Sequence, residues 1–337
     1  MGDRANQSGA PRLIARHCFL AAAVFGAICA VLWLVNARFP YVRSGATLVT
    51  EMKRGLAEAG RPFARDGSLR VMAFGSSKTL SGFIPDLFDR ETARLGVAGV
   101  ESYNFGLPGE FAFVEEFEAM VGRGAGPDVA LLIIPWPAED PPAPTVLRPI
   151  THDRPIIDAV FPFRKLPRDA FIMATESGFS PSRFRAAYAE SERTVKQVAL
   201  DRGYYFIARQ SHYANDQLPA AFTAPTDTPG QVAPRVIPRG PVFDRISNLC
   251  RERGVRCVYV PSYFREGQYA PARGHNPEAA SALAGHDEFA IVGPDYLLYP
   301  NRLFSDPIHT NRVGAEDYTR AIAALVAPEL KKGRAAP

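Results

Sequence analysis

The stretch Leu69-Arg70-Val71-Met72-Ala73-Phe74-Gly75-Ser76-Ser77-Lys78-Thr79-Leu80-Ser81-Gly82-Phe83 decides the fold of this chain. Its apolar start, residues 69–74, predicts a buried β-strand. The chain then turns at Gly75, passes two serines and runs toward a predicted helix after Pro85. Open α/β sheets place their chemistry at the carboxyl ends of their strands, and a helix that begins there directs N–H groups at developing negative charge. The turn is therefore a candidate site, although a Gly-Ser turn with a serine cap is also common as a purely structural element.

Strand and helix patterns alternate on both sides of this turn. Further strands are predicted at residues 99–105, 129–134 and 256–260. Helices are predicted at residues 47–59, 87–95, 111–121, 242–253 and 314–330. The run at 129–134 is apolar without interruption, which suits a central parallel strand covered by helices on both faces. This alternation predicts a doubly wound α/β sheet.

Composition narrows the class of protein. The net charge of +4, from 39 basic and 35 acidic residues, is too small to indicate nucleic-acid binding, and no basic stripe interleaved with aromatics is present. Many of the 30 prolines lie between residues 135 and 241, which predicts irregular structure there. Within this region helices are expected only at 167–175 and 182–200. We interpret residues 138–240 as an insertion that caps the carboxyl edge of the sheet.

The N-terminal region contains an uncharged, apolar run at residues 18–35. A transmembrane helix needs about 20 such residues, so this run predicts a single span. Basic residues before it, including Arg12 and Arg16, favour a cytoplasmic N-terminus and an external main domain. Two other interpretations are open: a signal peptide cleaved near Val35-Asn36-Ala37, or a buried helix of a soluble protein. The sequence thus predicts a cytoplasmic tail at residues 1–17, a signal anchor at 18–37, a juxtamembrane linker at 38–68, an α/β domain at 69–330 and a tail at 331–337.

The four cysteines form two pairs. Cys18 and Cys29 fall in the apolar run, where a thiol behaves as a small apolar group. Cys250 and Cys257 flank the segment 251–256, and no Cys/His spacing typical of zinc is present. A disulfide between Cys250 and Cys257 is one interpretation for a domain outside the cytoplasm; two half-buried thiols are the other.

Candidate catalytic residues are found at the two ends of the predicted domain. Serine becomes a nucleophile when a base, most often histidine, takes its proton, and a carboxylate usually orients that histidine. Of the six histidines only His309 follows a carboxylate, Asp306, by three residues on a segment that leads into a helix. Alone, Asp306 could be a turn cap and His309 a surface residue. Together with Ser77 and the segment Asn104-Phe-Gly-Leu-Pro-Gly109 they predict a serine-dependent site.

These motifs resemble those of the SGNH (GDSL-type) hydrolase-like superfamily, over residues 69–134 and about 242–330. The resemblance implies a three-layer α/β/α, flavodoxin-like fold with a parallel sheet. It also implies that Ser77 is the nucleophile, His309 the general base and Asp306 the orienting acid. The backbone N–H groups of Ser77 and Gly109 would form the oxyanion hole. Ser76 stands where the family usually has Asp, which leaves both serines as candidate nucleophiles.

The chain departs from the family pattern after the third predicted strand. The family usually carries Gly-x-Asn-Asp there, and its Asn completes the oxyanion hole, whereas this chain has Ile134-Pro135-Trp136-Pro137-Ala138. Losing one oxyanion donor typically costs about 10²–10³ in rate. Substrate contacts are predicted for Asn104, Trp136 and Asn311, and neither a metal nor a cofactor is expected.

The resemblance extends to membrane-anchored bacterial O-acetyltransferases and acetylesterases of cell-surface or exopolysaccharides. It implies an O-acyltransferase in the inner membrane with a periplasmic domain. It further implies a polysaccharide acceptor and a multi-spanning membrane acyltransferase as acyl donor, without nucleic acid. A carbohydrate acetylesterase, a lipid-ester hydrolase, and a catalytically inactive subunit of a polysaccharide synthesis or export complex are the alternatives.

Overall fold

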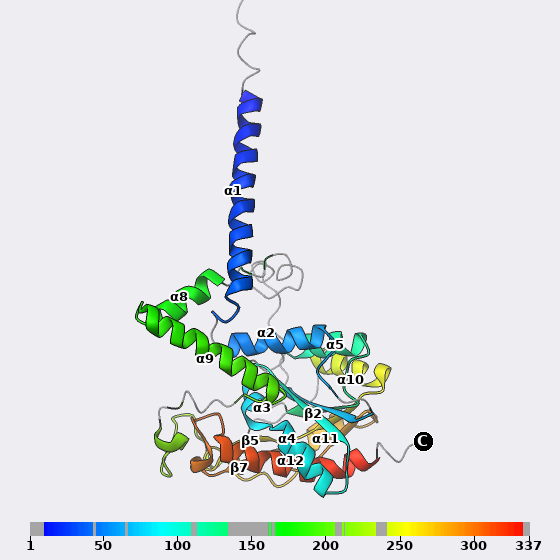
Figure 1. The fold of residues 1–337 in the computed structure, drawn as a ribbon. Helices are drawn as coiled ribbons and strands as arrows, with labels where there is room; N and C mark the ends of the chain where they lie inside the picture. Colours follow the sequence, from blue (N-terminus) through cyan, green and yellow to red (C-terminus); the bar gives the residue numbers. More distant parts are fainter. Residues whose placement is uncertain are drawn as a thin grey trace, which may run out of the picture. The chain divides into compact units, whose positions relative to one another are not determined.

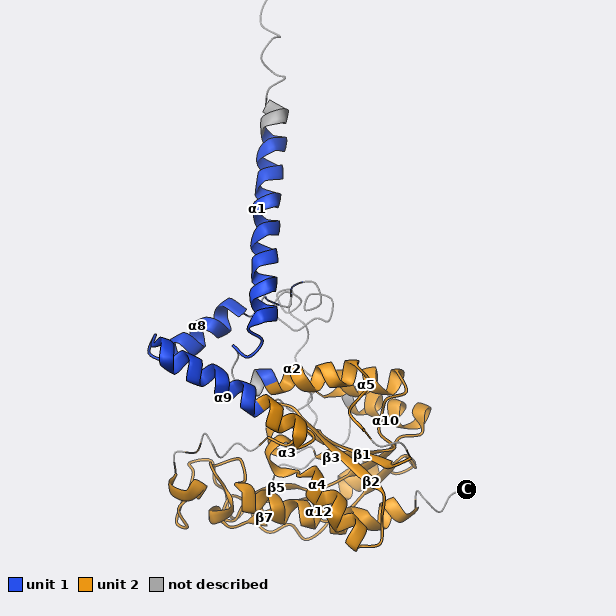
Figure 2. Cartoon of the chain, viewed as in Figure 1, with its two compact units in different colours: residues 1–48, 143–194 blue, residues 49–142, 195–337 orange. Residues whose placement is uncertain are grey.

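The computed structural model describes residues 10–42, 45–64, 67–108, 113–133, 161, 163, 166–205, 211, 213–233 and 241–332. The chain divides into two compact units, which Figure 2 shows in blue and orange. The first comprises residues 1–48 and 143–194, and the second comprises residues 49–142 and 195–337. The predicted insertion, 138–240, is thus shared between the two units.

The second unit is a mixed α/β structure built on a five-stranded sheet (Figure 1). Its strands are β1 (Leu69–Gly75), β2 (Val100–Gly106), β3 (Val129–Ile133), β4 (Arg256–Tyr259) and β6 (Phe289–Ile291). They lie in the order β2-β1-β3-β4-β6, and each neighbouring pair is parallel. Two short strands, β5 (Ser262–Arg265) and β7 (Tyr296–Tyr299), form a separate parallel pair. The parallel pairing agrees with the apolar runs at residues 71–74 of β1 and 129–133 of β3.

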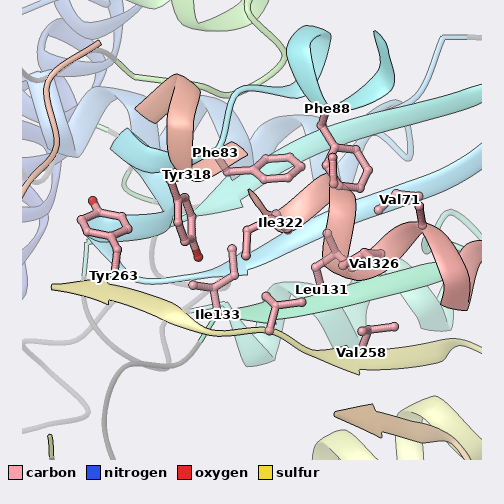
Figure 3. Close-up of a cluster of buried hydrophobic side chains, with 14 of the residues drawn as sticks. Val71, Phe83, Phe88, Leu131, Ile133, Val258, Tyr263, Tyr318, Ile322 and Val326 are labelled. Carbon is pink, nitrogen blue, oxygen red and sulfur yellow. The ribbon is translucent and has the colours of Figure 1, made fainter. Parts of the chain in front are cut away.

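Helices pack on both faces of the five-stranded sheet. The helices and 3₁₀ turns of the sheet region are α2 (Gly45–Glu58), α3 (Ser77–Gly82), α4 (Pro85–Arg94), α5 (Val114–Gly122), η2 (Ala214–Asp216), α10 (Pro241–Arg253), α11 (Pro277–Ala282), η3 (Asn301–Leu303) and α12 (Arg312–Lys332). Because strand side chains alternate between faces, Val71 packs in a core with α4 and α12, whereas Met72 packs in a core with α2, α5 and α10. Figure 3 shows the first of these cores, with Phe88, Leu131 and Ile322 among its members.

All four predicted strands are present, and so are the seven helices predicted outside the apolar N-terminal run, with ends that shift by up to three residues. Between the predicted strand at 256–260 and Asp306 the sequence predicted no elements, but the structure has β5, α11, β6 and β7 there. These strands have only three or four residues, and β6 is half-buried throughout, so no long apolar run marks them.

Cys250 on α10 and Cys257 on β4 are joined by a disulfide, with their Cα atoms 6.3 Å apart. The sequence was compatible with either a disulfide or two half-buried thiols, and the structure contains the disulfide. Cys18 and Cys29 are free thiols.

The first unit contains α1 (Ala10–Arg38), α8 (Leu166–Glu176) and most of α9 (Pro181–Leu200). Residues 14–38 of α1 are long and apolar enough to cross a membrane, and this part of the helix is not buried. Exposure of Phe19, Phe25 and Leu34 contradicts the interpretation of α1 as the buried helix of a soluble protein. The helix is thus an apolar segment at the N-terminus that is consistent with single-pass anchoring.

Candidate active site

The two serines after β1 have different roles in the local structure. Ser76 is the N-cap of α3, and its Oγ accepts a hydrogen bond from the backbone N–H of Lys78 at 3.3 Å. Serine is favoured at this position because its hydroxyl satisfies an N–H that has no partner inside the helix. Ser77 is the first residue of α3, and its Oγ lies 2.9 Å from Nε2 of His309. The structure thus places Ser77, and not Ser76, beside the predicted base.

Two glycines allow α3 to sit directly against the ends of the strands. A Cβ atom on Gly75 would lie 2.2 Å from Oγ1 of Thr79 and 2.3 Å from the carbonyl oxygen of Ile133. A Cβ atom on Gly106, at the end of β2, would lie 2.3 Å from the backbone nitrogen of Leu80. Neither position has room for a side chain, so these glycines fix where Ser77 stands relative to the sheet.

Asp306 and His309 are held together on one short loop. Oδ1 of Asp306 accepts hydrogen bonds from the backbone N–H groups of Ile308, at 2.7 Å, and His309, at 2.8 Å. Oδ2 lies 2.8 Å from Nδ1 of His309. The backbone N–H of Ser305 donates to the carbonyl of His309 at 2.9 Å and closes the loop. The aspartate therefore shapes the loop as well as orienting the imidazole.

The three predicted catalytic side chains form a continuous chain of hydrogen bonds. Asp306 contacts Nδ1 of His309, and Nε2 of the same ring contacts Oγ of Ser77. A carboxylate that accepts from Nδ1–H leaves the lone pair on Nε2, which is the tautomer that can take a proton from serine. The side chains of His309 and Asp306 are 17% and 33% exposed. The arrangement can thus activate Ser77 while solvent or a substrate reaches it.

The ionisation of Asp306 supports this tautomer. Burial by itself would raise the pKa of the carboxyl group. Hydrogen bonds and charge attraction from His309, with the backbone bond from Ile308, outweigh burial and hold the pKa of Asp306 below its usual value. The aspartate is therefore a carboxylate at neutral pH, and it stabilises the imidazolium that forms when His309 accepts a proton.

Lys78 follows the nucleophile and is buried beneath it. Its Nζ donates to the carbonyl of Tyr263 at 2.8 Å and lies 3.7 Å from the ring centroid of Phe264. Burial, reinforced by the charge of Arg265 and opposed by that of Asp306, lowers the pKa of Lys78 to about 7. No sequence motif predicted that Lys78 is buried with these partners, because Tyr263 lies 185 residues away along the chain.

Arg265 on β5 braces the loop that carries Asp306 and His309. Its Nε donates to the carbonyl of Pro307 at 2.9 Å. Its guanidinium forms a two-pronged ion pair with Asp227, with distances of 2.5 and 3.3 Å, and both side chains are buried. Asp227 belongs to the predicted insertion, so residues of that region reach the catalytic loop through this pair.

The side chains of Asn104 and Asn311 are hydrogen-bonded to the backbone of neighbouring elements. The amide nitrogen of Asn104 donates to the carbonyls of Thr79, Leu80 and Phe83, and its Oδ1 accepts from the N–H of Gly106. Asn311 accepts from the N–H of Gly314 at the start of α12, and its amide nitrogen donates to the carbonyls of Asp216 and Arg302. Both are buried. Their bonds hold α3 and the catalytic loop in place, which is a different role from the predicted substrate contact.

Two predicted site residues, Gly109 and Trp136, lie outside the described residues. Among the residues that the structure does describe, no group of three or more His, Cys, Asp or Glu side chains could hold a metal ion.

No family model, curated protein or solved structure matches this chain.

Proposed function

We propose that this chain is a membrane-anchored, extracytoplasmic serine O-acyltransferase of the SGNH type, which moves an acyl group, most simply acetyl, onto a polysaccharide. The observation that carries the proposal is the continuous contact from Ser77 through His309 to Asp306, at 2.9 and 2.8 Å. Helices on both faces of a parallel sheet, with the serine after the first strand, support the SGNH assignment.

The proposed reaction has two halves. Oγ of Ser77 attacks the acyl carbonyl while Nε2 of His309 accepts the hydroxyl proton, and the same proton then passes to the leaving group. The acyl-enzyme is resolved when His309 removes a proton from an acceptor hydroxyl, which attacks the ester carbonyl. The bond to Oγ of Ser77 then breaks, and Oγ takes the proton from His309, which restores the free enzyme. The N–H groups of Ser77 and Gly109 are the proposed oxyanion donors. Asp306 stays ionised and stabilises the imidazolium in both halves.

The proposed location rests on two independent features. The apolar, exposed α1 supports an anchor in the inner membrane. The Cys250–Cys257 disulfide supports a periplasmic domain, because disulfides persist in oxidising compartments and are rare in the cytosol. An N-terminus in the cytoplasm satisfies both features, since α1 precedes the domain that carries the disulfide.

The polysaccharide acceptor and a multi-spanning membrane acyltransferase as donor come from the resemblance of the motifs. Transfer requires that a sugar hydroxyl be held against the acyl-enzyme so that it outcompetes water, and positioning of this kind is worth effective molarities of 10⁵ M or more. Aromatic residues in the 138–240 region offer surfaces for stacking on sugar rings, although Phe163 and Tyr204 are buried and serve the core.

Transfer is tested by giving the full chain an activated acetyl ester with and without an added oligosaccharide. Acetylated oligosaccharide should form faster than free acetate, and Ser77→Ala should abolish both products. Fast acetate release that ignores the oligosaccharide would make the protein a carbohydrate acetylesterase. If the wild type forms neither product and a fluorophosphonate does not label Ser77, the result would favour the alternative that the chain is a catalytically inactive subunit of a polysaccharide synthesis or export complex.

Location is tested separately with reporters fused after Pro337. Alkaline phosphatase, which needs the periplasm, should be active, and a cytoplasm-dependent reporter should be silent. The reverse pattern would contradict the proposed topology and the extracytoplasmic acceptor with it.

A further inference from the structure

Helix α8 and the turn after it expose large apolar side chains on the face that does not pack against the rest of the first unit. Phe171, Ile172 and Phe179 are 63%, 36% and 69% exposed. The rings of Phe171 and Phe179 contact each other edge to face, with centroids 6.4 Å apart. The opposite face of α8 is apolar too, because Leu166 and Met173 are buried in the core of this unit. At helical spacing Arg168, whose side chain is 61% exposed, falls on the same side as Phe171 and Ile172. This side therefore combines a cation with large apolar side chains, as helices at a membrane interface do.

Phe179, one of the exposed residues, has an energetically unfavourable backbone conformation. Phe179 has a φ of +56°, and the preceding residue, Gly178, has a φ of +58°. A bulky residue other than glycine seldom adopts a positive φ, and such strain typically costs on the order of 1–3 kcal/mol. The Phe179 ring nevertheless stays 69% exposed, and it contacts the ring of Phe171, which is exposed too.

The contacts between α8 and α1 indicate which medium surrounds the exposed face of α8. Arg16 and Arg38 bound the uncharged part of α1, and at 1.5 Å per residue they are roughly 33 Å apart, close to the ~30 Å hydrocarbon core of a bilayer. The span therefore has little freedom to slide along its axis. Cys29 and Leu32 pack against the core that contains Leu166 and Met173, and they lie roughly 9–14 Å inside Arg38.

The surroundings of α8 have the composition of a membrane interface. Tyr188 on α9 stacks edge to face on Phe39 and on Tyr41, which follow the end of α1 at Arg38. Tyrosine and other aromatic residues are enriched at the membrane–water interface. Arg183 and Arg185 are exposed at the start of α9. The Arg183 guanidinium lies 3.8 Å from the Cβ position of Gly178, next to Phe179. Cations beside apolar side chains favour anionic lipid headgroups.

We infer that α8 and the turn at Phe179 form a second membrane contact, inserted into the leaflet on the Arg38 side with Phe171, Ile172 and Phe179 among the acyl chains. The inference rests on the anchoring that is part of the proposed function. It adds that the first unit is held by an interfacial helix as well as by its span, and that the occupant of the exposed face is lipid.

The test uses spin labels on the full chain, one copy per nanodisc, in phosphatidylethanolamine and phosphatidylglycerol. Single cysteines replace Phe171 or Phe179 in a Cys18→Ala/Cys29→Ala background that keeps the disulfide. Phe25→Cys, exposed on the span, is the matched lipid control, and Leu95→Cys, exposed at the end of α4, is the water control. Collision with oxygen reports lipid, and collision with a water-soluble nickel chelate reports solvent.

Labels at 171 and 179 should favour oxygen over the nickel chelate as the label at 25 does, and the label at 95 should show the opposite preference. If 171 and 179 behave like 95 while 25 remains in lipid, the membrane contact of α8 is refuted and the anchor stands. If 25 also reports water, the anchor and the contact both fall. Labels at 171 and 179 that are shielded from both reagents would show that protein, and not lipid, covers this face.

Discussion

The catalytic loop and helix α8 differ in whether their side chains have partners: Asp306 and His309 are hydrogen-bonded within the fold, whereas large apolar side chains on α8 are exposed. At the loop, each oxygen of Asp306 and each ring nitrogen of His309 has a partner. On α8, Phe171 and nearby Phe179 extend large apolar surfaces that no part of the described unit covers. The chain of contacts from Asp306 through His309 to Ser77 supports chemistry within the unit. Apolar surface held exposed, against backbone preference, indicates a partner outside it.

The comparison also shows where stability and function are coupled. Behind Ser77, the charges of Lys78, Arg265 and Asp227 come together from distant segments, so substitutions of these three residues should affect activity and folding together. On α8 the exposed rings contribute little to the fold of the unit, so changes there should affect membrane contact alone.

The largest effect is expected from removing the nucleophile or its base. Ser77→Ala and His309→Ala should each lower kcat at least about 10⁴-fold, and the double variant should be no worse than either single one, because the two residues act as a unit. Neither change leaves a core cavity, so unfolding midpoints should stay near that of wild type. Ser76→Ala is the matched control: it should keep activity and lose about 1 kcal/mol of stability through the missing cap. Activity in Ser77→Ala and its loss in Ser76→Ala would move the nucleophile back by one residue.

A smaller loss of activity with a large loss of stability is expected at Arg265. Arg265→Met leaves the buried carboxylate of Asp227 without its cation, which typically costs about 3–5 kcal/mol. It also removes the donor to the carbonyl of Pro307, so kcat should fall more than KM rises as the loop loosens. Denaturant titration and steady-state kinetics measure the two effects.

The double variant Arg265→Met/Asp227→Leu provides the control for that prediction. It removes both charges and should regain most of the lost stability, because no unpaired charge remains buried. Its kcat should stay low, since the Pro307 carbonyl still lacks a donor. Full recovery of kcat in the double variant would show that Arg265 acts only on the fold and does not position the catalytic loop.

Lys78 should make stability depend on pH. Its pKa is about 7 in the folded protein against 10.5 for the free side chain. Above pH 7 the unfolded chain therefore binds more protons than the folded one, and the free energy of unfolding rises with pH, by up to about 1.4 kcal/mol per unit. Buried Lys53, whose pKa is also lowered by burial, acts in the same direction. Lys78→Met should reduce the slope between pH 7 and the onset of tyrosine ionisation near about pH 10. An unchanged slope would mean that Lys78 is not the titrating group.

The smallest effect is expected from the disulfide. Replacing Cys250 and Cys257 by serine opens a short loop, with a sequence separation of 7, and should cost about 2 kcal/mol. Thiol titration of the exported, denatured protein should find Cys18 and Cys29 alone reactive. Four reactive thiols from the native membrane fraction would contradict a periplasmic location of the domain.

Sequence predicted the parts of this molecule that local pattern specifies. The apolar runs of β1 and β3 marked the centre of the sheet, and the short motifs around Ser77 and His309 marked the residues that the structure brings together. Arg265 and Lys78 could not be predicted, because each acquires its role from residues far away in the chain. The half-buried β6, at the sheet edge, has only three residues and lacks the long apolar run that would have identified it.

The same limit explains the two asparagines. Asn104 and Asn311 stand in the motifs where substrate contacts are expected, and only the structure shows that backbone groups of α3, η3 and α12 use their amides. A motif gives the position of a residue in the sequence, whereas hydrogen bonding across the fold decides which of its groups remain available.

The most direct test of the central claim is to map where a fluorophosphonate reacts with the full-length protein. Peptide mass spectrometry should find the adduct on Ser77 of the wild type and of Ser76→Ala, and labelling should fall sharply in His309→Ala because the base that activates the hydroxyl is missing. Absence of any adduct on a folded wild-type protein, or an adduct on Ser77 that forms equally fast in His309→Ala, would contradict the claim that Ser77, His309 and Asp306 work as a catalytic unit.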